Sequence, residues 1–501
     1  MTNTPTLDTE ASAAQCIRIA EAGADIVRLT AQGVAHARNL GEIRRRLRAS
    51  GISTPLVADI HFNPAAAFAA AENVEKVRIN PGNFVDPGRT FKQLEFTDEE
   101  YAAELQRLRD KVVPFLDLCR KNGTAIRIGV NHGSLSDRIM SRYGDTPAGM
   151  VESAMEFLRV CRDENFDNVV ISIKASNVVV MTDTVRLLVD TMACEGMSYP
   201  LHLGVTEAGD GEDGRIKSAV GIGSLLADGI GDTIRVSLSE APEAELPEAR
   251  RLVAHIAEIA SAPHIDGPAA TKTYSTERRK SHASGNIGGD NIPCAIEVDM
   301  APDAIPEDVK VLASKHKNRI GDIRSQFDRL DAAGDISPVI VRLIYPTGMP
   351  PEDVVIAAAT DFGALLLEGY RDGVWLDAPS LTQEQRRSLL LGILQATRTR
   401  ISHTEFIACP GCGRTLFDLP SVLRTIKDEC SHLKGLKIGV MGCIVNGPGE
   451  MADADYGYVG AAAGKVSLYK GKQCVEMNIP ASDALPRLIE LIKANGDWQE
   501  K

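Results

Sequence analysis

The sequence predicts an α/β protein whose first half is a barrel of parallel strands surrounded by helices. From residue 1 to about 240, short apolar strands alternate with longer helical patterns. The expected strands are Ile26–Thr30, Leu56–His61, Lys76–Ile79, Ala125–Val130, Val169–Lys174, Leu201–Val205 and Thr233–Leu238. Strands that alternate with helices form right-handed βαβ units in a parallel sheet. The expected architecture is a TIM-type (β/α)₈ barrel, although only seven of its eight strands can be recognised.

The start of the chain reads as the loop between a strand and a helix. Met1 is followed at once by Thr2-Asn3-Thr4-Pro5-Thr6, and Thr6 or Asp8 is placed to cap the next helix. We therefore expect the first barrel strand to lie before residue 1, or the barrel to be open at that point.

Two further units are expected after the barrel. In the first, strands are predicted at Ala295–Val298, Val339–Ile344, Val354–Ala359, Leu365–Glu368 and Trp375–Leu376, with helices from Pro306 and Thr382. This second α/β unit offers no catalytic constellation, which indicates a structural or positioning insert. In the last, helices alternate with antiparallel strands in a small α+β unit. The expected domains are residues 1–245, 246–400 and 401–501.

Composition excludes several classes of function. The net charge of −13 and an aromatic content of 5% disfavour a nucleic-acid surface. No apolar run is long enough to span a membrane, and no export signal is recognisable at the start. Ten cysteines, mostly single and in apolar runs, suit a reducing compartment. We expect a cytoplasmic protein without nucleic-acid or membrane partners.

Basic and imidazole side chains recur toward the carboxyl ends of the predicted strands. They are Arg28, His61, Arg78, Arg127, Lys174, His202 and Arg235, and polar residues such as Asn80, Asn131, Ser176, Glu207 and Ser237 follow in the loops. A single arginine in a strand is usually a paired structural residue, but so many at one end predict a site at the barrel mouth. A ring of cations with nearby backbone N–H groups suits a multiply charged phosphate.

Three cysteines in glycine-rich turns indicate a metal centre. Cys409 and Cys412 have C-x-x-C spacing, and Cys443 returns after a stretch long enough for one helix and one strand. One interpretation is an iron–sulfur cluster on these thiolates, with Glu450 as a displaceable oxygen ligand. The alternative is zinc, with Cys430 or His432 completing the set, although a zinc ribbon usually has a second close cysteine pair.

Three further features allow a functional and a structural interpretation. Glu207 is an acid/base candidate in a basic pocket, or a partner of Lys217. Asp59 and His61 lie on one face of a strand, as a catalytic or a structural pair. Gly221-x-Gly223 lacks the rest of a dinucleotide fingerprint, which favours a helix-packing role.

Together these residues resemble those of a known family, 4-hydroxy-3-methylbut-2-enyl diphosphate synthase of the non-mevalonate isoprenoid pathway, in its larger three-domain form. The matching stretches are Met1–Thr6, Gly23–Thr30, Val57–Phe62, Lys76–Asn83, Ile126–Ser134, Ser172–Asn177, Pro200–Gly209, Lys217–Leu238, Cys409–Thr415 and Met441–Glu450. The resemblance implies a TIM barrel, an insert, and a C-terminal unit like that of nitrite and sulfite reductases. It implies a [4Fe–4S] cluster held by Cys409, Cys412, Cys443 and Glu450.

The resemblance also implies the reaction. A two-electron reductive ring opening would convert 2-C-methyl-D-erythritol 2,4-cyclodiphosphate to (E)-4-hydroxy-3-methylbut-2-enyl diphosphate, with ferredoxin or flavodoxin as the electron donor. Glu450 would leave the cluster to admit a substrate oxygen, and Glu207, His61 or His202 would donate a proton. The implied substrate-binding residues are Arg28, Asp59, Arg78, Asn80, Arg127, Asn131, Ser172, Lys174, Ser176, Lys217, Arg235 and Ser237.

Two rival functions remain open at this point. A cluster-dependent dehydratase would use the open iron as a Lewis acid alone and need no external reductant. A zinc-ribbon binding module on an α/β scaffold would not be an enzyme. The sequence also leaves open whether the barrel and the cysteine-bearing unit meet within one chain or across a homodimer.

Overall fold

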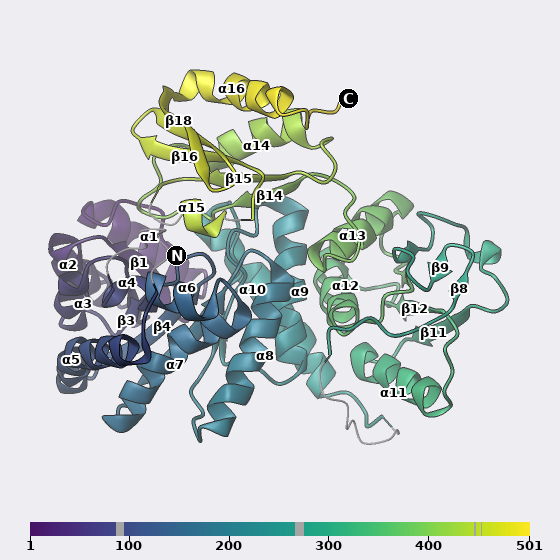
Figure 1. Ribbon diagram of the computed structural model, residues 1–501, viewed down its shortest axis with the longest axis horizontal. Coiled ribbons are helices and arrows are strands. Elements are labelled where there is room, and N and C mark those ends of the chain that lie inside the picture. Colours follow the sequence, from purple (N-terminus) through teal and green to yellow (C-terminus); the bar gives the residue numbers. More distant parts are fainter. Residues whose placement is uncertain (87–94, 266–274, 445–446, 452, 501) are drawn as a thin grey trace.

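A computed structural model of the chain describes residues 1–86, 95–265, 275–444, 447–451 and 453–500, with the side chains of Pro448 and Glu450 left out. Figure 1 shows three units: the first half of the chain forms the large body, the C-terminal unit lies above it, and the insert lies beside it. No helix among the described residues has the length and apolar character needed to cross a membrane.

The first unit contains the predicted parallel strands. They are β1 Val27–Ala31, β2 Leu56–Ile60, β3 Lys76–Ile79, β4 Ala125–Asn131, β5 Val169–Lys174, β6 His202–Leu203 and β7 Thr233–Ile234. Strands β1 to β5 are hydrogen-bonded in chain order, β6 pairs with β7, and a bridge between Ile171 and Leu201 joins the two sheets. The helices are α1 Thr9–Glu21, α2 Val34–Ala49, α3 Pro64–Ala71, α4 Pro81–Phe84, α5 Asp98–Asn122, α6 Asp137–Tyr143, α7 Pro147–Asp163, α8 Val178–Cys194, α9 Gly211–Ala227 and α10 Glu245–Ala260.

The described residues place no strand between β7 and β1, as the sequence predicts. Thr2 lies beside β1 and donates its backbone N–H to the Arg28 carbonyl at 3.0 Å. Asp8 is the N-cap of α1 and accepts a hydrogen bond from the Ala11 N–H at 3.0 Å, which satisfies one free helix donor. A cavity of about 720 Å³ lies at this opening, between α1, α10 and the barrel interior.

The insert is built on a four-stranded parallel sheet with the order β10-β13-β12-β11. Its strands are β10 Cys294–Ala295, β11 Lys310–Ser314, β12 Val339–Ile344 and β13 Gly373–Asp377, and its helices are α11 Arg319–Ala332, α12 Pro351–Leu367 and α13 Gln383–Ala396. A short hairpin, β8 Ala283–Ser284 and β9 Ile287–Gly288, precedes the sheet.

Three predictions for the insert are wrong. Val354–Ala359 and Leu365–Glu368 were expected as strands, but α12 covers the first and ends within the second. This helix is buried on nearly all sides, so its sequence is continuously apolar, as that of a buried strand would be. The helix expected from Pro306 is instead preceded by strand β11, and α11 begins at Arg319 after the Asn318 cap.

Helix α12 of the insert packs closely on α9 of the barrel. A methyl group at Gly223 would lie 2.5 Å from the Thr360 Oγ1, and one at Gly363 would lie 2.9 Å from a Val220 methyl. Only glycine allows the helix backbones to approach so closely. The predicted helix-packing role of Gly221-x-Gly223 is confirmed at Gly223.

The C-terminal unit has a five-stranded mixed sheet in chain order. Its strands are β14 Glu405–Ala408, β15 Lys437–Met441, β16 Tyr456–Ala462, β17 Lys465–Lys470 and β18 Gln473–Pro480, and its helices are α14 Leu419–Cys430, α15 Gly447–Glu450 and α16 Ala481–Ala494. The predicted mixture of helices and strands is confirmed, but β14, β15 and β16 run parallel, while β16, β17 and β18 pair antiparallel as expected. Helix α14 crosses over between β14 and β15, which returns the chain in the same direction.

Candidate active site at the barrel mouth

The C-terminal unit covers the mouth of the barrel in the same chain (Figure 1). Ala208, after β6, forms a parallel bridge with Ala408 at the end of β14, and the Ser239 hydroxyl donates to the Cys409 carbonyl at 2.8 Å. Farther around the mouth, Gly133 and Gly449 meet so closely that a methyl group at Gly133 would lie 2.1 Å from the Gly449 carbonyl oxygen. One chain therefore closes the mouth without a second copy.

A cavity of about 90 Å³ lies between the two units. Its barrel side contains most of the predicted substrate-binding residues, and its other side contains the three predicted cysteine ligands. The predicted residues that line it are Arg28, Asp59, His61, Arg78, Arg127, Asn131, Ser172, Lys174, Glu207, Arg235, Ser237, Cys409, Cys412 and Cys443.

Arg78 is the most fully bonded cation of the mouth. Its guanidinium donates to the Asp59 carboxylate at 3.1 Å, the Gly129 carbonyl at 2.9 Å and the Asn131 side-chain oxygen at 2.9 Å. These bonds link the ends of β2, β3 and β4 and fix the orientation of the Arg78 guanidinium.

The positive charges of the other cations are offset by fewer acidic or hydrogen-bonding partners. Arg235 pairs with Glu245 at 2.6 Å, a carboxylate that sequence reasoning missed. Burial, reinforced by the neighbouring arginines, lowers the pKa of Lys174 and of Arg127 well below the ordinary values. Burial likewise lowers the pKa of Arg28 to about 10. Crowded buried cations of this kind favour a bound anion, which would restore the ordinary charge balance.

Three titratable residues in the cavity, His61, Asp59 and Glu207, differ in their surroundings. Burial, followed by the charge of Arg78, lowers the pKa of His61 to about 3, so its imidazole is neutral at physiological pH. Burial opposes ionisation of Asp59, but Arg28 and Arg78 outweigh it and lower the pKa of Asp59 well below the usual value. Glu207 is buried at the cavity and has a positive φ of 49°, a backbone conformation rare outside glycine.

Four predicted residues are not brought to this cavity. His202, at the first residue of β6, bonds the Thr233 hydroxyl at 2.9 Å and lines the cavity at the barrel opening instead. Lys217 lies in α9 and pairs with Glu405 at 3.1 Å, outside the mouth. Asn80 caps α4 through the Gly82 N–H, and Ser176 is buried without lining the cavity. Position along the chain does not specify the direction or depth of a side chain, so a role for these four residues stays a prediction.

The three cysteines share the upper wall of the cavity. The Gly442 N–H donates to the Cys409 sulfur at 3.3 Å, and the Cys412 N–H donates to the Thr415 hydroxyl at 2.9 Å. Gly411 has φ of 75°, which turns the backbone between the first two cysteines. Burial raises the pKa of the Cys409 thiol, so a thiolate there requires a positive partner such as a metal.

The remaining zinc candidates lie elsewhere. Cys430 is fully buried in the core of the C-terminal unit, at the end of α14. His432 contacts the Gln499 carbonyl and the Trp498 ring. In the part of the chain that the structure describes, no group of three His, Cys, Asp or Glu side chains is arranged to hold a single metal ion. The predicted ligand Glu450 has a side chain outside the described part.

Comparisons with known proteins decide the family. Residues 1–250 match the GcpE TIM-barrel domain and residues 405–494 match the GcpE protein C-terminal domain. The chain is 54% identical to 4-hydroxy-3-methylbut-2-en-1-yl diphosphate synthase (flavodoxin) of Bacteroides fragilis strain ATCC 25285, over 100% of this chain and 93% of that protein. This chain belongs to the GcpE family.

More distant members of the GcpE family also match along the whole chain. Proteins of the same printed name from Akkermansia muciniphila and Protochlamydia amoebophila are 45% and 40% identical, over 99% and 100% of this chain and 93% of each relative. Because these alignments include the insert region, GcpE relatives with a comparable middle segment exist. Among solved structures, a β-glucosidase from Exiguobacterium marinum aligns with a TM-score of 0.20 at 12% identity, over 66% of this chain and 85% of that one, too weakly to carry an argument.

Besides Glu245, sequence reasoning missed a charged residue that lines the cavity of this GcpE site. Arg414 follows Cys412 by two residues and reaches across the cavity, with its Nη2 3.5 Å from the Asp59 carboxylate. Burial opposes its charge, but Cys412 and Asp59 outweigh burial and raise the pKa of Arg414. The signal that could have indicated Arg414 was the presence of a large cation in the cysteine-containing turn, which otherwise consists of small residues.

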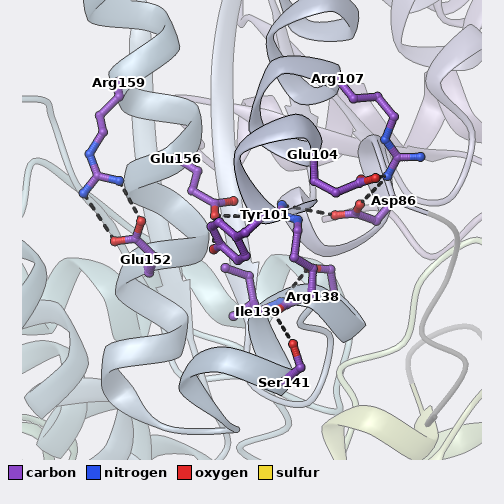
Figure 2. Close-up of polar contacts among 11 residues, drawn as sticks. Asp86, Tyr101, Glu104, Arg107, Arg138, Ile139, Ser141, Glu152, Glu156 and Arg159 are labelled. Atoms are coloured by element: carbon purple, nitrogen blue, oxygen red, sulfur yellow. Dashed lines mark hydrogen bonds and ion pairs between the residues drawn. The ribbon is translucent and has the colours of Figure 1, made fainter. Parts of the chain in front are cut away.

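A polar network holds α6, the helix that follows the β4 loop at the rim of the GcpE mouth (Figure 2). Arg138 of α6 pairs with Glu156 of α7 at 2.5 Å and with Asp86 at 3.4 Å, and Tyr101 of α5 also donates to Glu156. Arg107 binds the other oxygen of Asp86 at 3.0 Å. The network fixes α6 and thereby the Asn131–Ser134 turn that precedes it.

Proposed function

We propose that this chain is a 4-hydroxy-3-methylbut-2-en-1-yl diphosphate synthase that takes electrons from flavodoxin. It would convert 2-C-methyl-D-erythritol 2,4-cyclodiphosphate to (E)-4-hydroxy-3-methylbut-2-enyl diphosphate, a step of isoprenoid biosynthesis. One observation carries the proposal: a single cavity has clustered cations on its barrel side and three cysteines on the other. The printed names of full-length relatives agree with it.

The cysteine wall suits an iron–sulfur cluster better than a single zinc ion. Cys409, Cys412 and Cys443 supply three thiolates, and the backbone N–H of Gly442 points at one sulfur, the kind of bond that tunes such clusters. Of the two residues that could complete a zinc set, Cys430 lies in the core and His432 contacts Gln499 and Trp498. We propose a [4Fe–4S] cluster with Glu450 as its fourth ligand; when bound, it would supply single electrons and a Lewis-acidic iron.

The barrel side would bind the diphosphate. Arg127 and Lys174 are buried cations and Arg28 and Arg235 half-buried ones, all four line the cavity, and Arg78 is held in place by its three acceptors. An entering diphosphate would bond these cations and offset the repulsion that lowers the pKa of Lys174 and of Arg127. Ser172, Ser237 and Asn131 add neutral hydrogen-bonding groups to the same wall.

Loss of the substrate hydroxyl as water requires a proton, and Glu207 is the proposed donor. Its carboxyl lies at the cavity with its backbone in a rare conformation that aims it there. His61 is a poor donor, because a pKa of about 3 leaves its imidazole without the extra proton at physiological pH. His202 lies at the other cavity.

The remaining parts follow from this proposal. We propose a barrel at residues 1–245, an insert at 246–400 and a cluster-binding unit at 401–501 that resembles nitrite and sulfite reductases. The enzyme would work in the cytoplasm on a small cyclic diphosphate. A homodimer is compatible with this arrangement but is not needed to form the cavity, since both walls come from one chain.

Anaerobic purification with iron, sulfide and zinc analysis tests the proposal. We expect a brown protein whose turnover requires reduced flavodoxin. Turnover without any reductant would support the dehydratase instead, and a colourless protein with stoichiometric zinc would contradict both enzymes.

A pair of cysteine variants tests the ligand assignment in the same measurement. Cys443→Ser should lose the iron, because Cys443 lines the cavity. Cys430→Ser should retain it, because Cys430 is a core residue. Loss of iron from both variants to the same extent would show that the assignment is wrong.

A further inference from the structure

Arg414 is a cation that the C-terminal unit contributes to the cavity. Among the described residues that line this cavity, every other lysine or arginine belongs to the barrel. The Arg414 side chain is 8% exposed and follows directly after the cysteine turn. Its long side chain therefore reaches from one unit to the other while remaining almost fully buried.

The partner of Arg414 is firmly held by the barrel. Asp59 pairs with Arg78 at 3.1 Å and lies 3.6 Å from the His61 Nε2, and its side chain is 4% exposed. Arg414 approaches the second carboxylate oxygen at 3.5 Å. Removal of one partner of a buried ion pair leaves an uncompensated charge, so such pairs strongly favour the arrangement that keeps them together.

The Arg414–Asp59 ion pair lies on the side of the mouth away from the other charged contacts between the units. Lys217 pairs with Glu405 at 3.1 Å and Lys427 with Asp210 at 2.5 Å, both next to α9 and the end of β6. Asp59 is on β2, and the strand order places β2 and β6 several strands apart. The C-terminal unit is thus fixed electrostatically at two separated points.

We propose that Arg414 is a positioning residue that holds the C-terminal unit closed over the barrel mouth through Asp59 and keeps a positive charge beside Cys412. The closing role does not depend on the proposed reaction. The charge beside Cys412 rests on the proposed cluster and is tested separately.

Hydrogen–deuterium exchange on the full-length, anaerobically purified chain tests the closing role. Arg414→Gln should raise exchange in residues 131–136 and 411–417 by about tenfold. This corresponds to a loss of about 1.4 kcal/mol in the free energy that favours the closed arrangement. Asp59→Asn should have a similar effect, and the double variant should be no worse than either single one. The matched control is Arg424→Gln, since Arg424 is exposed on α14 and should leave exchange unchanged.

Two results would overturn the closing role: exchange in Arg414→Gln equal to that of the control, or effects of Arg414→Gln and Asp59→Asn that add. If Arg414→Gln does not fold, Arg414→Lys and Asp59→Asn carry the test. Lysine keeps the charge without the planar fork, so Arg414→Lys should show a smaller increase than Asp59→Asn. An equal increase would contradict the proposal.

The reduction potential of the cluster tests the second role. Loss of a positive charge makes the added electron less favourable, so Arg414→Gln should shift the midpoint potential to a more negative value. Arg414→Lys and Arg424→Gln should stay near the wild-type value. An unchanged potential in Arg414→Gln would refute the charge role. A protein that lacks iron would refute the proposed function, while leaving the exchange result valid.

Discussion

The barrel carries two neighbours, and it contacts them in different ways. The insert packs helix α12 on helix α9 through glycines and small side chains, with a buried His255–Asp361 contact of 2.7 Å at one side. The C-terminal unit is held by ion pairs, a strand bridge and backbone contacts around a cavity. The contact between insert and barrel resembles a protein core, while the contact between the C-terminal unit and the barrel is polar and surrounds the cavity. This difference suggests a fixed insert and a C-terminal unit that can separate to admit substrate.

The largest expected effect comes from the buried polar cluster at one side of the insert contact. Asp361 is fully buried and binds His255 of α10, the Tyr345 hydroxyl at 2.9 Å and Arg319 at 3.6 Å. Asp361→Ala leaves these groups without their common acceptor and should cost about 3–5 kcal/mol in chemical denaturation.

The control for this variant is Asp353→Ala on the same helix. Asp353 pairs with Arg251, but its side chain is 41% exposed. Its loss should cost about 0–1 kcal/mol. Equal destabilisation by the two variants would show that the insert contact is not core-like.

The next effect concerns the close approach of the two helices. Gly223→Val adds atoms where a methyl group already lies 2.5 Å from Thr360, and should cost about 1–3 kcal/mol through overpacking. Thr360→Ala should recover part of that loss in the double variant. Gly348→Ala is the control, because a methyl group there meets no atom within 4 Å. Additive losses in the double variant would contradict the direct contact.

The barrel could be predicted in detail because each strand is a short apolar run between helical patterns. Strands β3 and β5 match the expected bounds at both ends. The insert was less predictable because α12 is buried by neighbours on several sides, so its apolar residues follow no helical periodicity. A helix of this kind can be recognised only when its packing partners are known.

The same limit applies to the site. Cations at strand ends could be predicted because parallel strands end at one edge, and Arg28, Arg78 and Arg127 do line one cavity. Lys217 does not line this cavity, and its pairing with Glu405 could not be predicted because Glu405 belongs to another unit. Arg414 was missed for the same reason, since its partner Asp59 lies far away in the sequence. Local sequence patterns do not predict contacts between residues of different units.

The stabilities of the two contacts should depend on pH in opposite directions. Burial opposes protonation of His255, but Asp361 outweighs it and raises the pKa of His255 above 6.5. Protonated His255 therefore stabilises the insert contact below pH 6.5, and this contribution is lost as the pH rises through the raised value. Protection factors in α12, corrected for intrinsic exchange rates, should fall above that pH, and His255→Gln should remove the dependence.

The C-terminal contact should respond in the opposite direction. Burial opposes ionisation of Glu405 and Asp213, but Lys217 lowers the pKa of Glu405, and His403 and Lys427 lower the pKa of Asp213 to about 2. Their stabilisation is present above the ordinary carboxyl values and is lost as the pH falls toward the folded ones. Protection of β14 should therefore decrease in acid, and Glu405→Gln should reduce the change. A loss of protection at high pH in β14 would contradict the assignment.

The smallest effect expected is that of salt. At 1 M ionic strength charges are screened beyond about 3 Å, and pairs near the surface weaken most. The Lys427–Asp210 pair is about one-quarter exposed, so exchange in β14 and the 131–136 loop should rise a few-fold. Exchange in α12 should stay constant or fall, because salt does not weaken apolar packing. An equal rise in both places would mean that the two contacts share one opening motion, and the insert would then move with the C-terminal unit.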